Sequence, residues 1–527
     1  VQELEAKYLL AAGTSPDRVL RRLQESLSWA GFRVQPKGGR TQSDIYYDTA
    51  EYQLQKSGWS YRLRASGDKS RLALKELNRA RSGVFDREEI EQTLWGQPEN
   101  LARPPIGPVQ ERLRGLLRPS DAMHPLFEVT NRRVVFQLHH PDYPRSLIEM
   151  AFDRAQVEGR TEADDPLPFT ELEFELKRGP RELLANLLAI TELEGSLIRA
   201  RLSKYERGLI AAGCQLERRP PSSLSHIEPG TPWIDLAISH LRARLYDLKL
   251  YEPYAWESLH IEGVHQMRVA TRRARTALNT FIDVLPKVEA NALTEDIKWL
   301  TRALGPVRDL DVHLDHLADY REQLPTRNWI ALERYEQYLL RSRRRAHGVL
   351  IDALGSRDYT TLISDYGELL SAATEAGVSQ RHLRVGDLAW QQVRKPLKKV
   401  RKQGRAINKR SPPQALHHLR IDVKRLRYQL EYLLPAYPKL LAAPAKRLRQ
   451  LQNLLGDYQD TFVAQDHLRE YRDQQDVSKR DRKVFRKLMR MEAEKGETKR
   501  KDFDKAWRRF EVASYGLPKR LRPVDAD

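Results

Sequence analysis

The first ten residues, VQELEAKYLL (1–10), decide how the first half of this chain is expected to fold. Glu3, Glu5 and Lys7 occupy alternate positions, and apolar residues stand between them. Side chains of a β-strand point alternately to opposite faces of the sheet, so this pattern predicts a strand with one apolar face and one charged face. The charged face carries both signs, so its partner has to satisfy carboxylates and an ammonium group together.

Further stretches in the first 213 residues alternate in the same way. They are 44–49, 59–65, 71–77, 84–94, 132–138, 145–153 and 169–177. A solvated outer face would explain one such strand. About eight of them in one small domain favour a closed antiparallel barrel turned inside out, with helices over its apolar exterior and charges in its interior. We therefore expect an α+β fold, in which an eight-stranded antiparallel β tunnel barrel with surrounding helices precedes an all-α domain.

Carboxylates and basic side chains inside one tunnel require two kinds of ligand. Hard divalent cations, Mg²⁺ first among them, prefer carboxylate oxygens. Arginine and lysine side chains bind phosphate groups. A complex of a metal with a polyphosphate meets both requirements, and hydrolysis of its terminal phosphoryl group depends mainly on positioning and charge neutralisation. No P-loop, glycine-rich phosphate loop or Ser/His/Asp triad in the sequence competes with this interpretation.

Short motifs, taken in chain order, resemble the CYTH family, the triphosphate tunnel metalloenzymes. They are ELEAK (3–7), YYDT (46–49), the Arg-x-Arg of YRLRA (61–65), the lysine of ALKE (73–76), the arginine of DREEIE (86–91), the second arginine of NRRVVF (131–136), IEMAFD (148–153), ELEFELK (171–177) and SKYERG (203–208). The opening motif is short, but the ordered set is specific. The resemblance covers about residues 1–213.

This resemblance implies an inorganic triphosphatase, which hydrolyses triphosphate to diphosphate and phosphate with a divalent metal, Mg²⁺ or else Mn²⁺. It implies catalytic roles for Glu3, Glu5 and Lys7. The metal-binding carboxylates that it implies are Glu3, Glu5, Glu171, Glu173 and Glu175. The triphosphate-binding side chains that it implies are Lys7, Arg62, Arg64, Lys75, Arg87, Arg133 and Lys204.

The sequence leaves two interpretations open for several residues near the expected metal and phosphate ligands. Glu171 is either a metal ligand or a neighbour of the ligands. Arg207 either joins the phosphate-binding set or points outward. Glu149 and Asp153 either orient the basic groups or form structural salt bridges. The sequence does not divide the catalytic work among the tunnel glutamates.

The second half of the chain differs in charge and in periodicity. The net charge is +19, and about +17 of it lies after residue 220, which implies a polyanionic partner. Residues 217–232 are rich in Pro and Ser and read as a linker. We expect a tunnel domain over 1–216 and a helical domain over 233–520, made of two repeats at about 233–385 and 386–520.

Two helical stretches in this half align without gaps. They are HQMRVATRRARTAL (265–278) and HHLRIDVKRLRYQL (417–430), and LGPVRDLDV (304–312) likewise aligns with LGDYQDTFV (455–463). The offset is about 150 residues, which indicates a duplicated bundle. In each copy a histidine and three basic residues form one stripe along the helix. The histidines lack the neighbouring ligands of a metal site, so we expect them to bind phosphate.

The paired histidine–arginine helices resemble the CHAD family over about residues 225–515. This resemblance implies paired four-helix bundles that bind inorganic polyphosphate, and CYTH followed by CHAD is a known pairing. The expected polyphosphate-binding residues on the two helices are His265, Arg268, Arg272, Arg273, Arg275, His417, Arg420, Lys424, Arg425 and Arg427. A basic tract at 391–410 adds Lys395, Lys398, Lys399, Arg401, Lys402 and Arg405 to the expected surface.

The remaining expectations concern location and alternative functions. The single cysteine, Cys214, and the lack of a long apolar run or signal peptide suggest a cytoplasmic protein with no membrane partner. The CHAD resemblance implies an association with polyphosphate granules, and no protein partner is expected. One alternative is a tunnel phosphohydrolase acting on thiamine triphosphate or nucleoside triphosphates, or a cyclase. Another is a non-catalytic polyphosphate-binding or granule-targeting protein. Nucleic acid is a poorer partner, because the stripes have few amide or aromatic side chains for bases.

Overall fold

The computed structural model describes residues 2–11, 14–66, 69–77, 84–95, 104–158, 166–214, 226–474 and 476–521. Its contacts divide the chain into two compact units. The barrel unit comprises Val1–Arg219 together with Tyr251–Gly263, and the helical unit comprises Pro220–Leu250 together with Val264–Asp527. The return of Tyr251–Gly263 to the barrel unit was not predicted. The domain bounds expected from the sequence stay predictions, and residues 217–225 of the expected linker lie outside the described residues.

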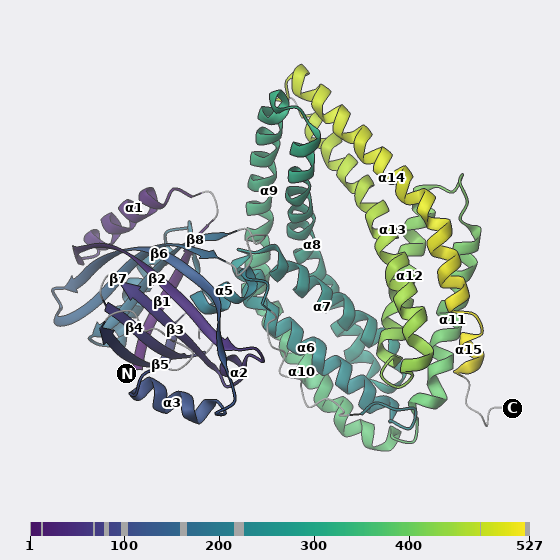
Figure 1. Cartoon of the computed structure of the whole chain (residues 1–527), viewed down its shortest axis with the longest axis horizontal. Coiled ribbons are helices and arrows are strands. Elements are labelled where there is room, and N and C mark those ends of the chain that lie inside the picture. The colour runs from purple at the N-terminus through teal and green to yellow at the C-terminus, as the bar shows by residue number, and fades with distance from the viewer. Residues whose placement is uncertain are drawn as a thin grey trace. The chain divides into compact units, whose positions relative to one another are not determined.

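One antiparallel sheet contains all the strands that the described residues form. They are β1 (Gln2–Leu10), β2 (Arg33–Thr49), β3 (Trp59–Ser66), β4 (Lys69–Glu76), β5 (Val84–Trp95), β6 (Met123–His140), β7 (Tyr143–Glu158), β8 (Leu167–Arg178) and β9 (Leu197–Arg199). Their order is β5-β4-β3-β2-β6-β7-β8-β1-β9, and β5 also pairs with β1. This last pairing closes a ring of eight strands within the described chain, which confirms the predicted antiparallel barrel (Figure 1).

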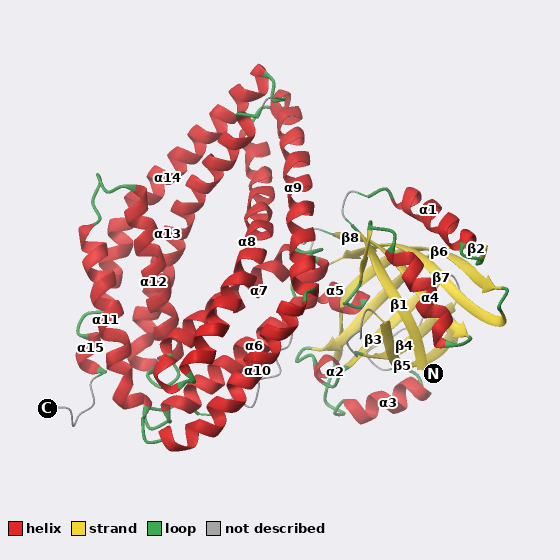
Figure 2. Cartoon of the chain, turned by 180° about the vertical axis from the view of Figure 1, so that it is seen from behind, coloured by secondary structure: helices red, strands yellow, loops and turns green. Residues whose placement is uncertain are grey.

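Helices cover the apolar outside of the barrel. They are α1 (Pro16–Trp29), α2 (Gln53–Lys56), α3 (Pro108–Leu116), α4 (Arg181–Glu192) and α5 (Lys204–Ala211). Leu27 of α1 and Leu187 of α4 pack in one core with Tyr8 of β1 and Phe174 of β8. Figure 2 shows α4 lying near β1 and α1 lying beside β2. Because the outward faces are buried under helices, the charged faces of the strands point into the barrel.

The helical unit repeats one arrangement of helices. The first copy includes α6 (Trp233–Glu257), α7 (Ile261–Thr280), α8 (Lys287–Gln323), α9 (Trp329–Gly355) and α10 (Arg357–Ala376). The second copy includes α11 (Val385–Ala406), α12 (Pro413–Leu433), α13 (Pro438–Arg472), α14 (Lys479–Ala513) and α15 (Leu517–Arg520). The aligned sequence motifs fall on α7 and α12 and on α8 and α13. The predicted all-α region is confirmed.

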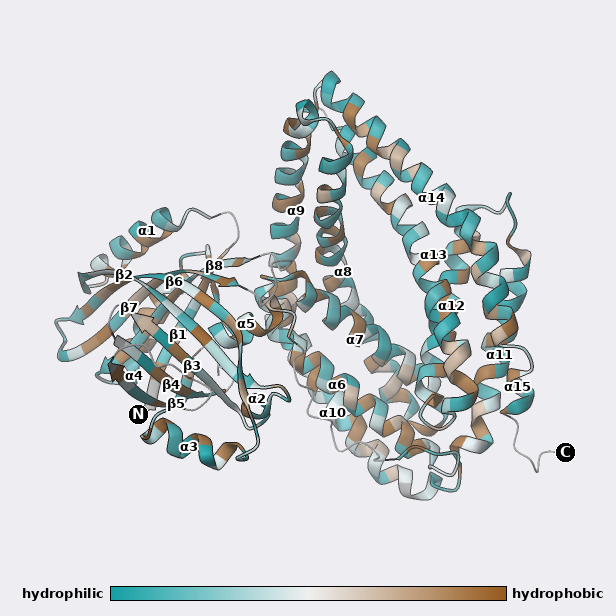
Figure 3. Cartoon of the chain, in the orientation of Figure 1, coloured by the Kyte–Doolittle hydropathy of each residue, from teal (hydrophilic) through white to brown (hydrophobic). Residues whose placement is uncertain are grey.

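The C-terminal parts of α8 and α13 pack in one core with the N-terminal parts of α9 and α14. Leu317 of α8, Tyr335 of α9, Tyr471 of α13 and Phe485 of α14 pack together there. Along these helices hydrophobic and hydrophilic residues alternate with the helical turn (Figure 3), as expected for helices that bury one stripe. Within the described residues, no helix is both long enough and apolar enough to span a lipid bilayer.

Candidate active site

A cavity of about 440 Å³ lies inside the barrel, and every strand of the ring contributes side chains to it. Of the described residues that line it, ten are basic and six are acidic. The basic ones are Lys7, Arg40, Arg62, Arg64, Arg71, Lys75, Arg87, Arg133, Lys177 and Lys204. The acidic ones are Glu5, Glu89, Glu91, Glu149, Glu173 and Glu175. The surplus of positive charge suits an anionic ligand.

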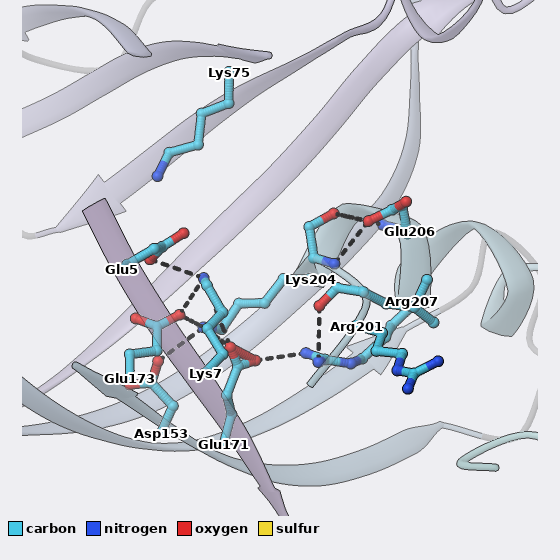
Figure 4. Close-up of polar contacts among 12 residues, drawn as sticks. Glu5, Lys7, Lys75, Asp153, Glu171, Glu173, Arg201, Lys204, Glu206 and Arg207 are labelled. Carbon is cyan, nitrogen blue, oxygen red and sulfur yellow. Dashed lines mark hydrogen bonds and ion pairs between the residues drawn. The ribbon is translucent and has the colours of Figure 1, made fainter. Parts of the chain in front are cut away.

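Glu173 of β8 is the centre of the ion pairs in this cavity (Figure 4). Its Oε1 accepts hydrogen bonds from Lys7 Nζ at 2.7 Å and from Lys204 Nζ at 2.6 Å, and its Oε2 pairs with Arg133. Asp153 of β7 accepts further bonds from Arg133 at 2.8 Å and from Lys204 at 2.9 Å. Burial opposes ionisation of Glu173, but Arg133, Lys204 and Lys7 outweigh it and hold the pKa of Glu173 well below its usual value.

Glu5 of β1 forms a second buried group with basic neighbours. It pairs with Arg87 of β5, and its Oε2 lies 3.1 Å from Lys7 Nζ. Burial would raise the pKa of Glu5, but Lys7, Arg87 and Lys75 lower it to about 2. The Glu5 carboxyl is therefore ionised at neutral pH.

The opposite wall of the cavity is held by Asp44 of β2. Its carboxylate accepts hydrogen bonds from Arg64 Nε at 2.7 Å and from Arg62 Nη1 at 3.3 Å. Glu89 of β5 lies 3.0 Å from Lys75 Nζ. Burial opposes ionisation of Asp44, but the two arginines lower its pKa to about 2. These pairs fix the basic side chains while leaving them on the cavity wall.

The strand register also places like charges directly opposite each other. Arg40 of β2 faces Arg133 of β6, and Arg64 of β3 faces Arg71 of β4. All four side chains line the cavity. Like charges opposite each other weaken a sheet. An anion between them would remove this repulsion, so the register itself favours an anionic ligand.

In the helical unit, the two basic stripes meet where α7 packs against α12. Arg272 Nε donates to the Tyr428 hydroxyl at 2.7 Å, and the Tyr432 hydroxyl donates to the Arg273 carbonyl at 2.8 Å. Burial, with Arg272 and other arginines of both helices, lowers the pKa of Lys424 to about 7. The stripes therefore form one crowded basic surface.

Family comparisons agree with both parts of this geometry. A model of the CYTH domain matches residues 2–209, and a model of the CHAD domain matches residues 239–469. This chain combines a CYTH domain with a CHAD domain. The two resemblances read from the sequence motifs are thereby confirmed.

Individual relatives are distant. An uncharacterized protein of Mycobacterium tuberculosis is 28% identical over 263 residues, which cover 48% of this chain and 48% of that protein. The inorganic triphosphatase of Haemophilus influenzae is 27% identical over 176 residues, which cover 33% of this chain and 46% of that protein. The chain thus spans about half the length of the curated relatives it matches. The crystal structure of the CHAD domain from the plant Ricinus communis is 25% identical, with a TM-score of 0.46, and the match covers 57% of this chain and 96% of that one.

The CYTH cavity brings together most of the residues that the sequence singled out. It contains Glu5, Lys7, Arg62, Arg64, Lys75, Arg87, Arg133, Glu173, Glu175 and Lys204. The backbone of Glu3 lies in β1 opposite Arg87, and its side chain is outside the described residues. Glu171 is buried beside the cavity without lining it, and it pairs with Arg207. Arg207 is itself buried, so it does not point outward.

Other cavity residues were missed by the sequence analysis. Glu89 and Glu91 follow Arg87 at a spacing of two, and this spacing could have identified them. Arg40 had no such signal, because the first part of β2 lacks apolar alternation. Lys177 ends the ELEFELK motif of the charged strand face, but the family resemblance does not assign it to the site.

Three neighbouring carboxylates of the CYTH cavity have the donor chemistry of divalent-cation ligands. The register places Glu5, Glu175 and Glu149 side by side on β1, β8 and β7, and all three line the cavity. Three adjacent carboxylates repel one another, and a divalent cation would relieve that repulsion. Their side chains do not converge in this structure, since no group of three His, Cys, Asp or Glu among the described residues is arranged to hold a metal. The carboxylate oxygens are donors that suit a hard cation, whereas the described side-chain positions do not form a site for one.

Three basic residues on α11 of the CHAD domain bind neighbouring groups of the helical unit. Lys399 Nζ pairs with Asp422 of α12 at 2.9 Å. Asp422 stands two positions from both Arg420 and Lys424, which places it on a different face of α12. Arg401 donates to the Ser514 carbonyl at 2.6 Å, and Arg405 pairs with Glu511. Lys395, Lys398 and Lys402 are exposed.

Proposed function

We propose that the CYTH domain hydrolyses inorganic triphosphate to diphosphate and phosphate with the help of a divalent cation, Mg²⁺ before Mn²⁺. One observation carries this proposal: a closed barrel cavity in which like-charged arginine pairs and a row of carboxylates stand on neighbouring strands. The arginines match the phosphate oxygens, and the carboxylates match the cation that accompanies them.

An inorganic substrate fits the cavity better than an organic triphosphate. Among the described lining residues, the uncharged side chains are Tyr46, Ser60, Ser203 and Tyr205. Pockets for organic ligands are mostly apolar, with a few placed polar groups. A thiazole or nucleobase would have to lie among charged side chains here. This argues against thiamine triphosphate, nucleoside triphosphates and cyclase chemistry.

Triphosphate binding has to open ion pairs that already exist within the cavity. Lys7 and Lys204 hold Glu173, and the entering phosphate oxygens compete for the same ammonium groups. The substrate also brings negative charge close to Glu5 and Glu175. Glu5 and Glu175 would hold a divalent cation, and its charge would neutralise this crowding of anions. We therefore expect triphosphate hydrolysis to require a divalent cation, because the substrate and the cavity carboxylates are both negatively charged.

Glu5 and Lys7 have different roles in the proposed reaction. A carboxylate with a pKa of about 2 is a weak base, so Glu5 either holds the cation or orients the attacking water by accepting a hydrogen bond. Glu173, Glu5 and Glu171 raise the pKa of Lys7 against the opposing effect of burial, so its ammonium group stays charged. It donates to the phosphate oxygens as negative charge develops on them.

Phosphate release from triphosphate tests this proposal. Wild type should turn over triphosphate with Mg²⁺ and lose activity with a chelator. Glu5→Gln should lower kcat at least about a hundredfold, as expected when a charge acting in the transition state is removed. Glu192→Gln, which affects a surface pair with Arg199, should keep full activity. Tight binding without turnover would make this a binding or targeting protein.

We further propose that the CHAD domain binds inorganic polyphosphate through the stripes of α7 and α12. The support is a surface of like charges in which Lys424 is crowded by Arg272 and Arg420. Binding should weaken with salt, and polyphosphate should outcompete DNA at equal phosphate concentration. A cytoplasmic location near polyphosphate granules is part of the same proposal. Preference for DNA would contradict it.

A further inference from the structure

The barrel unit includes a stretch of chain from the region that the CHAD model matches. Tyr251–Gly263 forms the end of α6 and the start of α7 and belongs to the barrel unit. Trp256 Nε1 donates to the Arg199 carbonyl at 2.9 Å, and the Arg201 guanidinium lies 3.4 Å from the centre of the Trp256 ring. These contacts place the next residue, Glu257, beside the segment that leads into α5.

The Glu257 side chain is 1% exposed and fully engaged with that segment. Its Oε1 accepts hydrogen bonds from the backbone N–H groups of Arg201 at 2.7 Å and Leu202 at 2.8 Å. Arg207 donates to the same carboxylate through Nε at 2.6 Å and Nη2 at 3.1 Å. A buried bidentate pair of this kind fixes the plane of the guanidinium group.

Arg207 transmits this constraint to the edge of the cavity (Figure 4). Its Nη1 donates to Glu171 Oε2 at 2.5 Å. Glu171 Oε1 has no hydrogen-bond partner among the described residues, although Lys204 Nζ lies at 3.5 Å and Lys7 Nζ at 3.7 Å. Glu171 therefore supplies negative charge behind two cavity ammonium groups, and Arg207 sets its position.

We propose that Glu257 is a positioning residue of the triphosphate site. It holds Arg207, Arg207 holds Glu171, and Glu171 keeps Lys7 and Lys204 in place for the phosphates. The CYTH domain is thus completed by a carboxylate from the chain region that the CHAD model matches. This inference rests on the proposed triphosphatase function.

The inference is tested by measuring KM for triphosphate in the full chain, for wild type and for variants of Glu257. In Glu257→Gln the side-chain oxygen remains as an acceptor for the backbone N–H groups, but the charge opposite Arg207 is lost. We expect KM for triphosphate to rise about tenfold, with a smaller fall in kcat, because Lys7 and Lys204 are displaced. Glu257→Asp keeps the charge and should recover part of the affinity. In an Arg207→Gln background, Glu257→Gln should change KM no further.

A matched control separates positioning from stability. Asp311→Asn removes a buried ion pair with Arg343 in the helical unit. It should lower the melting temperature and leave KM unchanged. An unchanged KM in Glu257→Gln, or an equal rise in Asp311→Asn, would overturn the inference. If Glu257→Gln does not fold, Glu257→Asp decides, and a KM equal to that of wild type would then count against it.

Equilibrium binding of triphosphate in the absence of metal separates two outcomes. One is failure of the Glu257 inference, and the other is failure of the proposed triphosphatase function. If wild type binds triphosphate but never turns it over, the triphosphatase proposal fails. The dissociation constant then replaces KM, and a tenfold weaker constant in Glu257→Gln would still support positioning. An unchanged constant would reject it.

Discussion

Lys7 Nζ lies 2.7 Å from Glu173 Oε1, and the two residues face each other directly across the pairing of β1 with β8. The same carboxylate also binds Lys204 of α5 and Arg133 of β6. One acidic side chain therefore places basic groups from three separate elements on one cavity wall. The cavity is organised by an internal anion, which under the proposed function a phosphate would partly replace.

Replacing Glu173 should therefore test how strongly the cavity depends on this anion. Glu173→Gln leaves Lys7, Lys204 and Arg133 without their shared partner, so the free energy of unfolding of the barrel unit should fall by about 3–5 kcal/mol. Triphosphate should restore more stability to this variant than to wild type, because its oxygens take the place of the carboxylate. Thermal unfolding with and without triphosphate measures both effects.

Glu91→Gln is the control for that measurement. Glu91 pairs with Arg71 at the exposed end of the cavity. Exposed pairs of this kind contribute at most about 1 kcal/mol. Equal losses in the two variants would show that Glu173 does not organise the basic groups.

Acid should unfold the barrel unit partly through Glu5. Lys7, Arg87 and Lys75 overcome burial and lower the pKa of Glu5 from 4.5 to about 2, so its ionised form stabilises the folded state. This contribution is fully present above pH 4.5 and is lost as pH falls from about 4.5 to 2. It amounts to about 3 kcal/mol for a shift of this size. Stability measured in urea from pH 6 to pH 2.5 should fall less steeply in Glu5→Gln, and parallel curves would contradict the assignment.

Much of the barrel could be predicted from its sequence, because alternation is a property of each strand by itself. Glu5 and Lys7 had to share a face, and covering helices left only the interior for that face. The pairing of strands could not be predicted in this way. That Arg40 faces Arg133 depends on residues about ninety positions apart, and the exposed first part of β2 carries no apolar pattern.

Glu257 shows a second limit of the sequence motifs. Nothing in its neighbourhood resembles a phosphate site, and it stands about fifty residues beyond its partner Arg207. The basic tract on α11 shows the opposite case, a strong sequence signal. Its composition alone suggested that it forms one binding surface together with the stripes. Lys399 and Arg405 instead pair with carboxylates, away from the stripe on α12. Net charge alone does not indicate which face of the helical domain carries a basic surface.

Close packing of α5 on β6 yields a prediction about Gly208. A Cβ at this position would clash with the buried Phe127 ring, so Gly208→Ala must displace either that ring or α5, which carries Lys204 and Arg207. We expect a loss of about 1–3 kcal/mol in stability and reduced triphosphatase activity. Gly348→Ala is the matched control, because Gly348 lies in α9 with no atom within 4 Å of an added Cβ. It should stabilise its helix by about 0.5–1 kcal/mol, and a stable, fully active Gly208→Ala would contradict the packing argument.

Polyphosphate binding by the CHAD domain should be coupled to a proton. Burial, together with Arg272, Arg420, Arg268 and Arg425, lowers the pKa of Lys424 to about 7. A bound polyanion favours the charged amine and raises that pKa, so binding at pH 8 takes up a proton. Affinity should therefore fall by up to about tenfold per pH unit above pH 7. Calorimetric titration at pH 8 in two buffers of different ionisation enthalpy measures the proton directly. Lys424→Arg keeps its charge and should take up almost none, whereas uptake equal to that of wild type would assign the proton to another group.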